Sequence, residues 1–327
     1  MALQHLSKSF KVADGTAYSY VHIAPTSENK TFLLLHGFPS SGYDWRRQIK
    51  TLGEKGYGVI VPDLLGYGDT DKPSQIENYK WKTMAGHIAE ILAHEGYEKV
   101  IGVSHDWGSG LLSRVYNYYP QLLEKLVFVA VPYMEPATFN LDAINELTIQ
   151  AFGYPVFGYW KFFNGDDAAK ICDEHNNAVT SLLYPVTPVT QRNHLCPFGA
   201  AKEWISNGTV PKEIPTWLSP AEISTHNDIL GKGGYTGPLN WYKAVIRGYN
   251  DEDEANIPDD RRTINAPTLF INGLDDPITR PEVAEQISQS GRIPNVTLSK
   301  IAGAGHWVYL EKEVEFLDSL LNFVKTA

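Results

Sequence analysis

The sequence predicts an α/β protein, in which a mostly parallel sheet flanked by helices is interrupted by a mainly helical lid. Two observations predict this class. Short apolar segments alternate with amphipathic helical segments in both terminal parts of the chain. The middle of the chain lacks comparable apolar segments and is instead rich in proline, tryptophan and tyrosine. At 327 residues the chain is long enough for one large domain that carries a substantial insertion.

In the first part of the chain we expect four buried strands, at 31–37 (TFLLLHG), 57–63 (YGVIVPD), 99–105 (KVIGVSH) and 124–132 (EKLVFVAVP). Between the second and third strands, Met84, Ile88, Ile91 and Leu92 fall on one face of a predicted helix, and Gly96 offers a C-terminal stop. This segment is therefore predicted to be the crossover helix that joins two parallel strands.

The strand and helix pattern resumes near the C-terminus. We expect strands at 267–276 and 295–303, and helices at 280–291 and 313–325. The two ends of the chain would then form a single core domain, made of residues 1–132 and 263–327. Residues 133–262 would form the inserted lid. The acidic run DEDE at 251–254 is expected to be a solvated loop.

Composition excludes several functional classes. Hydrophobic residues make up 43% and charged residues 20%, as in globular proteins, and no apolar run approaches the roughly 18 residues of a membrane span. The net charge of −10, without a basic cluster, argues against nucleic acid or an anionic membrane as a partner. Neither terminus shows a recognisable targeting signal, so the expected location is cytoplasmic. The oligomeric state is left open.

The two cysteines, Cys172 and Cys196, are expected to be packing residues. Two are too few for a disulfide scaffold, and they lack the partners and the spacing of a metal site. We therefore expect neither a metal nor a cofactor.

The segment GVSHDWGSG, residues 102–110, has the small-residue spacing of a nucleophile elbow. An elbow needs small residues two positions before and after the nucleophile, because the turn from strand to helix is tight. With Asp106 as the nucleophile these residues are Ser104 and Gly108, both small. With Ser104 as the nucleophile the second flank would be Asp106, which suits that position poorly. The spacing favours Asp106, although an aspartate here also suits a simple helix N-cap.

Two further candidates follow in the chain order nucleophile, acid, histidine. His306 lies in the glycine-rich segment AGAGHW after the last predicted strand, at the sheet edge where open α/β sheets bind ligands. Asp276 follows another strand and would orient His306 and stabilise its charged form. The adjacent Asp275 competes for this role, and the spacing from Gly273 favours Asp276.

The segment HGFP, residues 36–39, follows the first long apolar strand. The backbone N–H of Phe38 is expected to form an oxyanion hole together with the N–H of Trp107. The alternative is a simple tight turn after the strand.

The motifs HGFPSSGYDWR, PDLLGYGDTDKP, SHDWGS, INGLDDP and GAGHW together resemble those of the α/β-hydrolase fold, and within it those of the epoxide hydrolases. The resemblance covers core and lid, and it implies an aspartate nucleophile, in agreement with the spacing argument for Asp106. It also implies two lid tyrosines that donate hydrogen bonds to the epoxide oxygen. The segments VFGYWKFF and GPLNWYKA place Tyr159 and Tyr242 at these positions.

Three positions depart from the pattern of this family. Ser104 stands where glycine is usual, and Leu65 stands where the PDLRGYG pattern has arginine. Both changes are expected to affect only local packing. Trp160 stands where some animal members have glutamine, and with Trp107 and Phe38 it is expected to shape the substrate pocket.

The resemblance implies a reaction in two steps. The Asp106 carboxylate would attack a ring carbon of a small apolar epoxide while Tyr159 and Tyr242 hydrogen-bond or protonate the oxygen. His306, backed by Asp276, would then activate the water that hydrolyses the ester to a vicinal diol. Such a reaction fits both detoxification and biosynthesis.

Three other functions compete with this one. A haloalkane dehalogenase shares the fold and the aspartate nucleophile, but many of its members have asparagine at the position of Phe38. An esterase would use Ser104 and is disfavoured by Asp106 in the tight position. A non-catalytic ligand receptor on the same scaffold would retain the same residues, since a fold does not determine a function.

Overall fold

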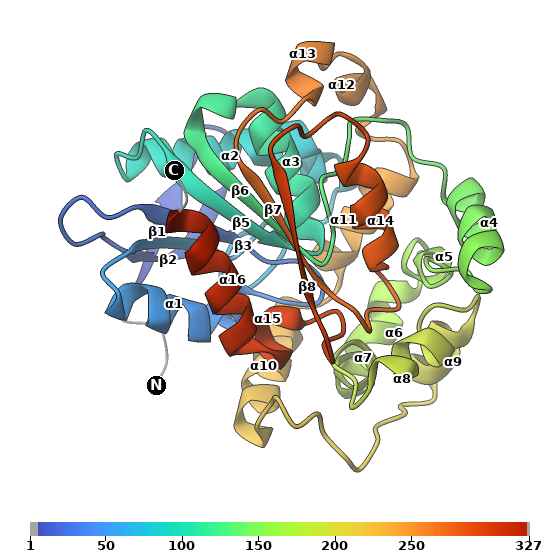
Figure 1. The fold of residues 1–327 in the computed structure, drawn as a ribbon. Coiled ribbons are helices and arrows are strands. Elements are labelled where there is room, and N and C mark those ends of the chain that lie inside the picture. The colour runs from blue at the N-terminus through green and yellow to red at the C-terminus, as the bar shows by residue number, and fades with distance from the viewer. Residues whose placement is uncertain (1–5, 326–327) are drawn as a thin grey trace.

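A mostly parallel sheet forms the centre of the molecule in the computed structural model, which describes residues 6–325 (Figure 1). The described residues form eight strands in the order β1-β2-β4-β3-β5-β6-β7-β8. The pairs β1–β2 and β2–β4 are antiparallel, and the other neighbouring pairs are parallel. The strands are β1 Ser7–Lys11, β2 Ala17–Ile23, β3 Thr31–Leu35, β4 Gly58–Pro62, β5 Val100–His105, β6 Leu123–Val129, β7 Thr268–Gly273 and β8 Val296–Ile301. The predicted fold class is confirmed.

Each of the six predicted strands is present, and four of them (β3, β4, β5 and β7) are buried along their whole length. The sequence analysis did not predict the hairpin of β1 and β2. Tyr18 and Tyr20 in AYSYVHI point into the core at every second position, a period-2 pattern that is typical of a strand with one buried face.

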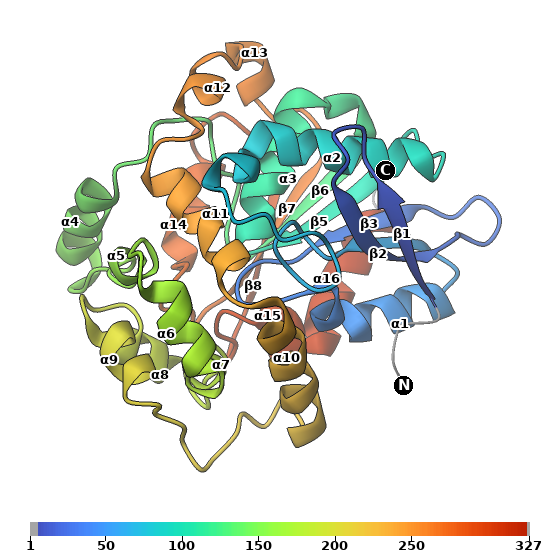
Figure 2. The ribbon, with the colours of Figure 1, turned by 180° about the vertical axis from the view of Figure 1, so that it is seen from behind.

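Helices cover both faces of the sheet. Helices α2 and α3 pack against each other on one face, and α1 and α16 lie on the other (Figures 1 and 2). The core helices are α1 Arg46–Glu54, α2 Trp81–His94, α3 Trp107–Tyr118, α14 Pro281–Ser288, α15 Val308–Glu311 and α16 Glu313–Lys325, with short 3₁₀ helices η2 Gly42–Trp45, η3 Ile76–Tyr79 and η4 Pro120–Leu122. No helix within the described residues 6–325 is both long and apolar enough to cross a membrane.

Between β6 and β7 the chain forms helices and loops, all of which the structure describes. The helices are α4 Leu141–Phe152, α5 Trp160–Phe163, α6 Ala168–Glu174, α7 Asn176–Leu183, α8 Pro188–His194, α9 Ala200–Ser206, α10 Pro220–Gly233, α11 Thr236–Ile246, α12 Asp251–Ala255 and α13 Asp259–Arg262. Helices α4 to α9 lie to one side of the sheet (Figure 1). The limits 133–262 for the lid remain those that the sequence predicts.

The expectation of a solvated loop at 251–254 was wrong. This segment belongs to the helix α12, and Glu254 is buried with a side-chain exposure of only 5%. The cause is Arg114 of α3, whose guanidinium nitrogens lie 2.5 Å from both carboxylate oxygens of Glu254. A buried carboxylate in this setting is retained because it is paired and hydrogen-bonded.

Candidate active site

The turn between β5 and α3 presents Asp106 at the carboxyl edge of the sheet. Asp106 has φ 51° and ψ −124°, a strained conformation for a residue with a side chain. The turn is tight and leaves no room for a side chain at Gly108, where a Cβ atom would lie 2.5 Å from the carbonyl oxygen of Leu35 in β3. Asp106 occupies the N-cap position of α3, but its side chain makes no capping hydrogen bond there. Its carboxylate is directed elsewhere.

The Asp106 carboxylate is held from two sides. The backbone N–H of Phe38 donates a 2.8 Å hydrogen bond to Oδ1, and Nε2 of His306 lies 3.6 Å from Oδ2. Burial would raise the pKa of Asp106, but the hydrogen bond and charge of His306, with the Phe38 N–H, bring it below its ordinary value. Asp106 is therefore ionised at neutral pH.

Asp276 and His306 follow the carboxyl ends of β7 and β8 and come into contact there. Nδ1 of His306 lies 2.9 Å from Oδ2 of Asp276. The backbone N–H groups of Ile278 and Thr279 donate to Oδ1 of Asp276 at 2.8 and 3.0 Å, which holds the carboxylate in place. The competing Asp275 is exposed to solvent. The structure thus brings Asp276, and not its neighbour, to His306.

The two aspartates raise the pKa of His306. Burial alone would lower this pKa, but the charge of Asp276 and the hydrogen bonds to Asp106 and Asp276 raise it to about 10. The pKa of Asp276 lies below its ordinary value, because the charge and hydrogen bond of His306 and the Thr279 hydrogen bonds outweigh the effect of burial. With Asp106 ionised, His306 is an imidazolium at neutral pH.

Tyr159, just before α5, and Tyr242, in α11, lie near each other over the elbow. Their ring centroids are 6.2 Å apart, and the ring of Tyr242 meets that of Trp107 edge to face at 4.8 Å. Both tyrosines are buried, and burial raises the pKa of each well above its ordinary value, as does the charge of Asp106. Both hydroxyl groups therefore keep their protons at neutral pH.

A cavity of about 370 Å³ opens at Asp106. Apart from Asp106 and Trp107 at the elbow, its walls are mainly apolar and come from the segment after β6, from α4 and α5 with the loop between them, and from α14 with the loop before it. Besides Asp106, Trp107, Tyr159 and Trp160, the lining residues are Val131, Pro132, Tyr133, Met134, Glu135, Phe139, Ile144, Thr148, Phe152, Val156, Phe157, Ile278, Thr279, Arg280, Val283 and Ile287. Its volume is in the range of small-molecule sites.

Phe38 and Tyr242 are not among the residues that line this cavity. The ring of Phe38 packs edge to face against Tyr242 and Phe163, with both ring centroids at 5.1 Å. Phe38 therefore contributes its backbone N–H to Asp106, while its side chain packs against Tyr242 and Phe163. Trp107 and Trp160, whose ring centroids are 5.0 Å apart, do line the cavity.

The model of the α/β hydrolase fold family matches residues 30–313. The chain belongs to the α/β hydrolase fold family.

Within this family, the similar proteins include epoxide hydrolases. Epoxide hydrolase A of Mycobacterium tuberculosis (strain ATCC 25618 / H37Rv) is 29% identical over 305 residues, which cover 89% of each protein. The crystal structure of epoxide hydrolase A from Mycobacterium thermoresistibile superposes with a TM-score of 0.80 at 27% identity over 98% of both chains. The resemblance that the motifs predicted is confirmed.

Bifunctional epoxide hydrolase 2 of Mus musculus is a longer relative. It is 25% identical over 312 residues, which cover 94% of this chain and 53% of the mouse protein. The chain thus spans about half the length of that relative.

Three residues of this α/β hydrolase support the site but were not predicted. Thr279 donates a short hydrogen bond to Oδ2 of Asp276, and Glu311 and His105 bind the backbone around His306. Each bonds to Asp276 or to the backbone of residues 305–307, and Thr279 also lines the cavity. The motif INGLDDPIT places a threonine three residues after Asp276, and such a position could have identified Thr279 as a local hydrogen-bond partner.

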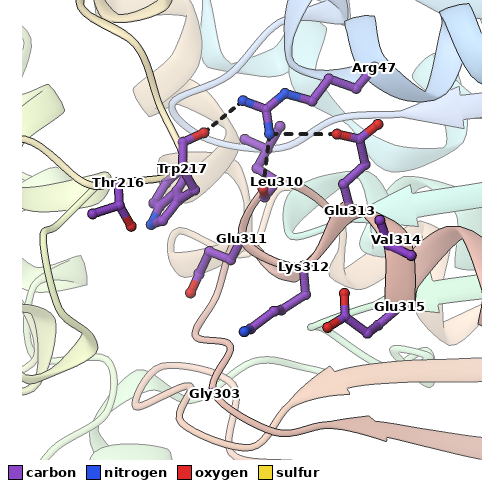
Figure 3. Close-up of a pocket in the computed structure, with 10 residues that line it drawn as sticks. All are labelled: Arg47, Thr216, Trp217, Gly303, Leu310, Glu311, Lys312, Glu313, Val314 and Glu315. Carbon is purple, nitrogen blue, oxygen red and sulfur yellow. Dashed lines mark hydrogen bonds and ion pairs between the residues drawn. The ribbon is translucent and has the colours of Figure 1, made fainter.

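A second hollow, of about 420 Å³, lies on the surface beside α15 and the start of α16 (Figure 3). Arg47, Trp217 and Glu311 line it, together with Thr216, Gly303, Leu310, Lys312, Glu313, Val314 and Glu315. It is slightly larger than the cavity at Asp106, but none of the predicted site residues lines it. Of the predicted site residues, Asp106, Trp107, Tyr159 and Trp160 line the smaller cavity instead.

Cys172 and Cys196 are both free and buried, and burial raises the pKa of each thiol well above its ordinary value. Neither is a reactive thiolate at neutral pH. Within residues 6–325, no group of three or more histidine, cysteine, aspartate or glutamate side chains has an arrangement that could hold a metal ion.

Proposed function

We propose that this chain is an epoxide hydrolase that opens a small apolar epoxide to a vicinal diol through a covalent ester on Asp106. The observation that carries the proposal is the position of one ionised carboxylate. Asp106 faces the His306–Asp276 pair on one side and an apolar cavity lined by the protonated Tyr159 on the other. The similarity to proteins named epoxide hydrolases supports it.

In the first step, Oδ2 of Asp106 attacks one ring carbon and the strained C–O bond of the ring breaks. Oδ1 accepts the Phe38 N–H at 2.8 Å, which leaves Oδ2 as the attacking atom. The developing alkoxide takes a proton from Tyr159 or Tyr242. A phenol is intrinsically a stronger acid than an aliphatic alcohol, so a protonated tyrosine is a competent donor to the alkoxide.

Formation of the ester changes the role of His306. The charge of Asp106 and its hydrogen bond both contribute to the raised pKa of His306. Alkylation removes that charge, so the pKa of His306 falls, and the imidazolium returns its proton, by way of water, to the tyrosinate that the first step leaves behind. His306 is then able to act as a general base in the second step, with Asp276 stabilising the charge that it regains.

In the second step, His306 takes a proton from water while the water oxygen attacks the carboxyl carbon of Asp106. The oxyanion forms on Oδ1, where the Phe38 N–H, and in this proposal the Trp107 N–H, stabilise it. The bond from the carboxyl carbon to Oδ2 then breaks, and the departing diol oxygen takes a proton from His306. The Asp106 carboxylic acid that remains gives its proton to His306, which restores the carboxylate and the imidazolium. A serine would form an ether, which water cannot hydrolyse in this way.

Two rival functions lose support from the geometry. A serine esterase would need Ser104, but its buried hydroxyl lies 3.0 Å from that of Ser109 within the core. A haloalkane dehalogenase needs donors for the departing halide. Phe38 has a ring where many of those enzymes have an amide, and that ring packs against Tyr242.

Intact-protein mass spectrometry tests the proposal. The variant His306→Gln, mixed with styrene oxide and with several long-chain epoxides, should gain the mass of one epoxide, because the ester forms but is not hydrolysed. Peptide mapping should place the added mass on Asp106, and Asp106→Asn should gain none. An adduct with a haloalkane instead would favour the dehalogenase. Ligand binding without any adduct would favour a receptor, and either outcome would refute the proposal.

A further inference from the structure

The backbone around His306 is held by two side chains that bond to its peptide groups and make no hydrogen bond to its imidazole, although the ring of His105 packs against it with ring centroids 4.7 Å apart. The carboxylate of Glu311 accepts the N–H of Gly305 at 2.8 Å and the N–H of Trp307 at 3.0 Å, one residue on each side of His306. The carbonyl oxygen of His306 itself accepts a 2.9 Å hydrogen bond from Nε2 of His105. We call Glu311 and His105 the backbone clamp.

Glu311 lies at the end of α15, and its carboxylate faces the surface hollow next to Lys312 (Figure 3). Each of its two oxygens takes one N–H, so the carboxylate spans the whole peptide segment that carries His306. The segment has little stiffness of its own, because Gly303 and Gly305 flank it and Gly303 adopts φ 67°. A Cβ on Gly305 would lie 3.2 Å from an oxygen of Glu311, so the close approach depends on glycine.

His105 reaches the same segment from the opposite side. It is the last residue of β5, directly before Asp106, and is fully buried. Burial and the charge of His306 lower the pKa of His105 to about 3, so the ring is neutral and carries one N–H. The hydrogen bond to the His306 carbonyl requires that N–H to be on Nε2. Nδ1 is buried without a hydrogen-bond partner in the described part of the chain, as expected for the unprotonated nitrogen.

We propose that Glu311 and His105 are positioning residues that fix the His306 backbone, so that the imidazole meets Asp276 and the Asp106 ester in one geometry. His105 links the histidine loop to the strand that carries the nucleophile, and Glu311 links the same loop to α15. Misplacement of a catalytic group by about 1 Å can reduce a rate about 100-fold. The role in ester hydrolysis rests on the proposed function.

A purely structural role is the alternative for Glu311, because Trp307 is the N-cap residue of α15 and its N–H needs an acceptor. The two roles differ in their kinetics. A purely structural role would change the stability of the protein and would affect the rates of both chemical steps to the same extent. A positioning role should slow ester hydrolysis, in which His306 acts as base, more than ester formation, in which it does not.

The kinetic test compares Glu311→Gln, Glu311→Leu and His105→Phe with the wild type, using styrene oxide in rapid-quench mass spectrometry. We expect hydrolysis of the ester to slow at least 10-fold in Glu311→Leu and less in Glu311→Gln, which keeps one carbonyl acceptor. Ester formation should change less than threefold, so the esterified fraction at steady state should rise. His105→Phe keeps the ring but removes the donor, and should behave like Glu311→Leu.

Glu315→Gln is the matched control, because Glu315 lines the same hollow and is exposed. It removes the same charge without a bond to the histidine loop and should match the wild type in both rates. Circular dichroism and thermal melting verify that each variant folds. If Glu311→Leu fails to fold, Glu311→Gln carries the test alone.

Nuclear magnetic resonance of the His306 ring tests the clamp without any substrate. In the wild type the Asp276 contact keeps the pKa of His306 raised. In a folded Glu311→Leu or Glu311→Gln protein a displaced ring should titrate at least one pH unit lower than in the wild type. If both the pKa of His306 and the rates of the two steps are unchanged in these variants, Glu311 and His105 do not position His306. If no variant forms an ester with any epoxide, the proposed function is wrong. The titration of His306 then tests by itself whether the backbone clamp positions the ring.

Discussion

The charge of Asp106 contributes, beside that of Asp276, to the raised pKa of His306, and this coupling can be measured directly. The pKa of His306 in the free protein is raised to about 10, in part by Asp106. Because the folded pKa exceeds the ordinary value of 6.5, protonated His306 stabilises the fold fully below pH 6.5 and less as the pH rises through about 10.

The substitution Asp106→Asn should therefore lower the pKa of His306, because it removes a carboxylate 3.6 Å from Nε2 but leaves Asp276 in place. A titration of the histidine ring signals by nuclear magnetic resonance measures the shift. The alkaline loss of stability should also begin at a lower pH than in the wild type. An unchanged pKa would mean that Asp106 does not set the protonation state of the base.

Tyr159 is the tyrosine of the pair that lines the cavity, so its hydroxyl should matter most in ester formation. In Tyr159→Phe we expect the rate of ester formation to fall about 100-fold, the lower end of what a positioned proton donor contributes. Hydrolysis of the ester should change little, because His306 and not Tyr159 acts in that step. Single-turnover kinetics of both steps measures this difference. An equal loss in both steps would argue against a role as acid.

Among the individual site residues, the sequence predicted those that lie within recognisable motifs, but not those that hold them in place. Asp106, Asp276 and His306 each follow a strand in a recognisable motif, and the structure brings the three together. Glu311 and His105 were not predicted, because what matters is their contact with a backbone segment distant in the chain. His105 meets the His306 carbonyl across 201 positions of sequence, a contact that local pattern cannot reveal.

Among the secondary-structure elements, the strand-to-helix turn at the elbow leaves little room for a larger side chain. A Cβ on Gly108 would lie 2.5 Å from the Leu35 carbonyl oxygen, and a backbone atom cannot move aside as a side chain can. Gly108→Ala should destabilise the protein by about 2 kcal/mol, as overpacking does in well-packed interiors. It should also slow ester formation, because the turn that presents Asp106 must widen.

Gly86→Ala is the control for this substitution. A Cβ on Gly86, in α2, would meet the hydroxyl oxygen of Tyr119 at an ordinary 3.5 Å. Alanine in a helix interior is more favourable than glycine by about 0.5–1 kcal/mol, so this variant should be neutral or more stable. Urea denaturation measures both changes. A Gly108→Ala protein as stable as the wild type would show that the elbow has more space than the structure indicates.

The elements that the sequence predicted well are those with a strong hydrophobic pattern. Strands β3, β4, β5 and β7 are buried on both faces and appear as continuous apolar runs. Many helices between β6 and β7, such as α6, α7 and α9, are short and pack against one another, so their limits depend on tertiary packing that a local pattern does not contain. Glu254 in α12 is the sharpest case, since its burial depends on Arg114 in α3.

At the scale of the whole molecule, Arg114 and Glu254 join the lid to the core. Arg114 also donates a 2.5 Å hydrogen bond to the carbonyl oxygen of Met134, which lines the cavity, and Glu254 accepts the N–H of Ala137 at 3.1 Å. The pair therefore ties α3 both to the segment that leaves the core and to the helix that returns. The side chains are only 4% and 5% exposed, so the pair is largely shielded from solvent screening.

The substitution Glu254→Ala should destabilise the protein by about 3–5 kcal/mol, because it leaves the Arg114 charge buried and unpaired. It should also raise KM for an apolar epoxide more than it lowers kcat, since the Met134 segment forms one wall of the cavity while Asp106 and His306 keep their contacts. Urea denaturation and steady-state kinetics measure the two effects. Glu252→Ala, on the exposed face of the same helix, should change neither.

The double substitution Arg114→Met with Glu254→Leu separates the cost of an unpaired charge from the loss of the connection itself. Removing both charges should recover much of the lost stability, because apolar residues of similar volume often replace a buried ion pair without loss. The raised KM should persist, since neither new side chain can bind the Met134 carbonyl or the Ala137 N–H. Recovery of both stability and KM would show that the pair contributes packing alone, and that the cavity wall does not depend on its hydrogen bonds.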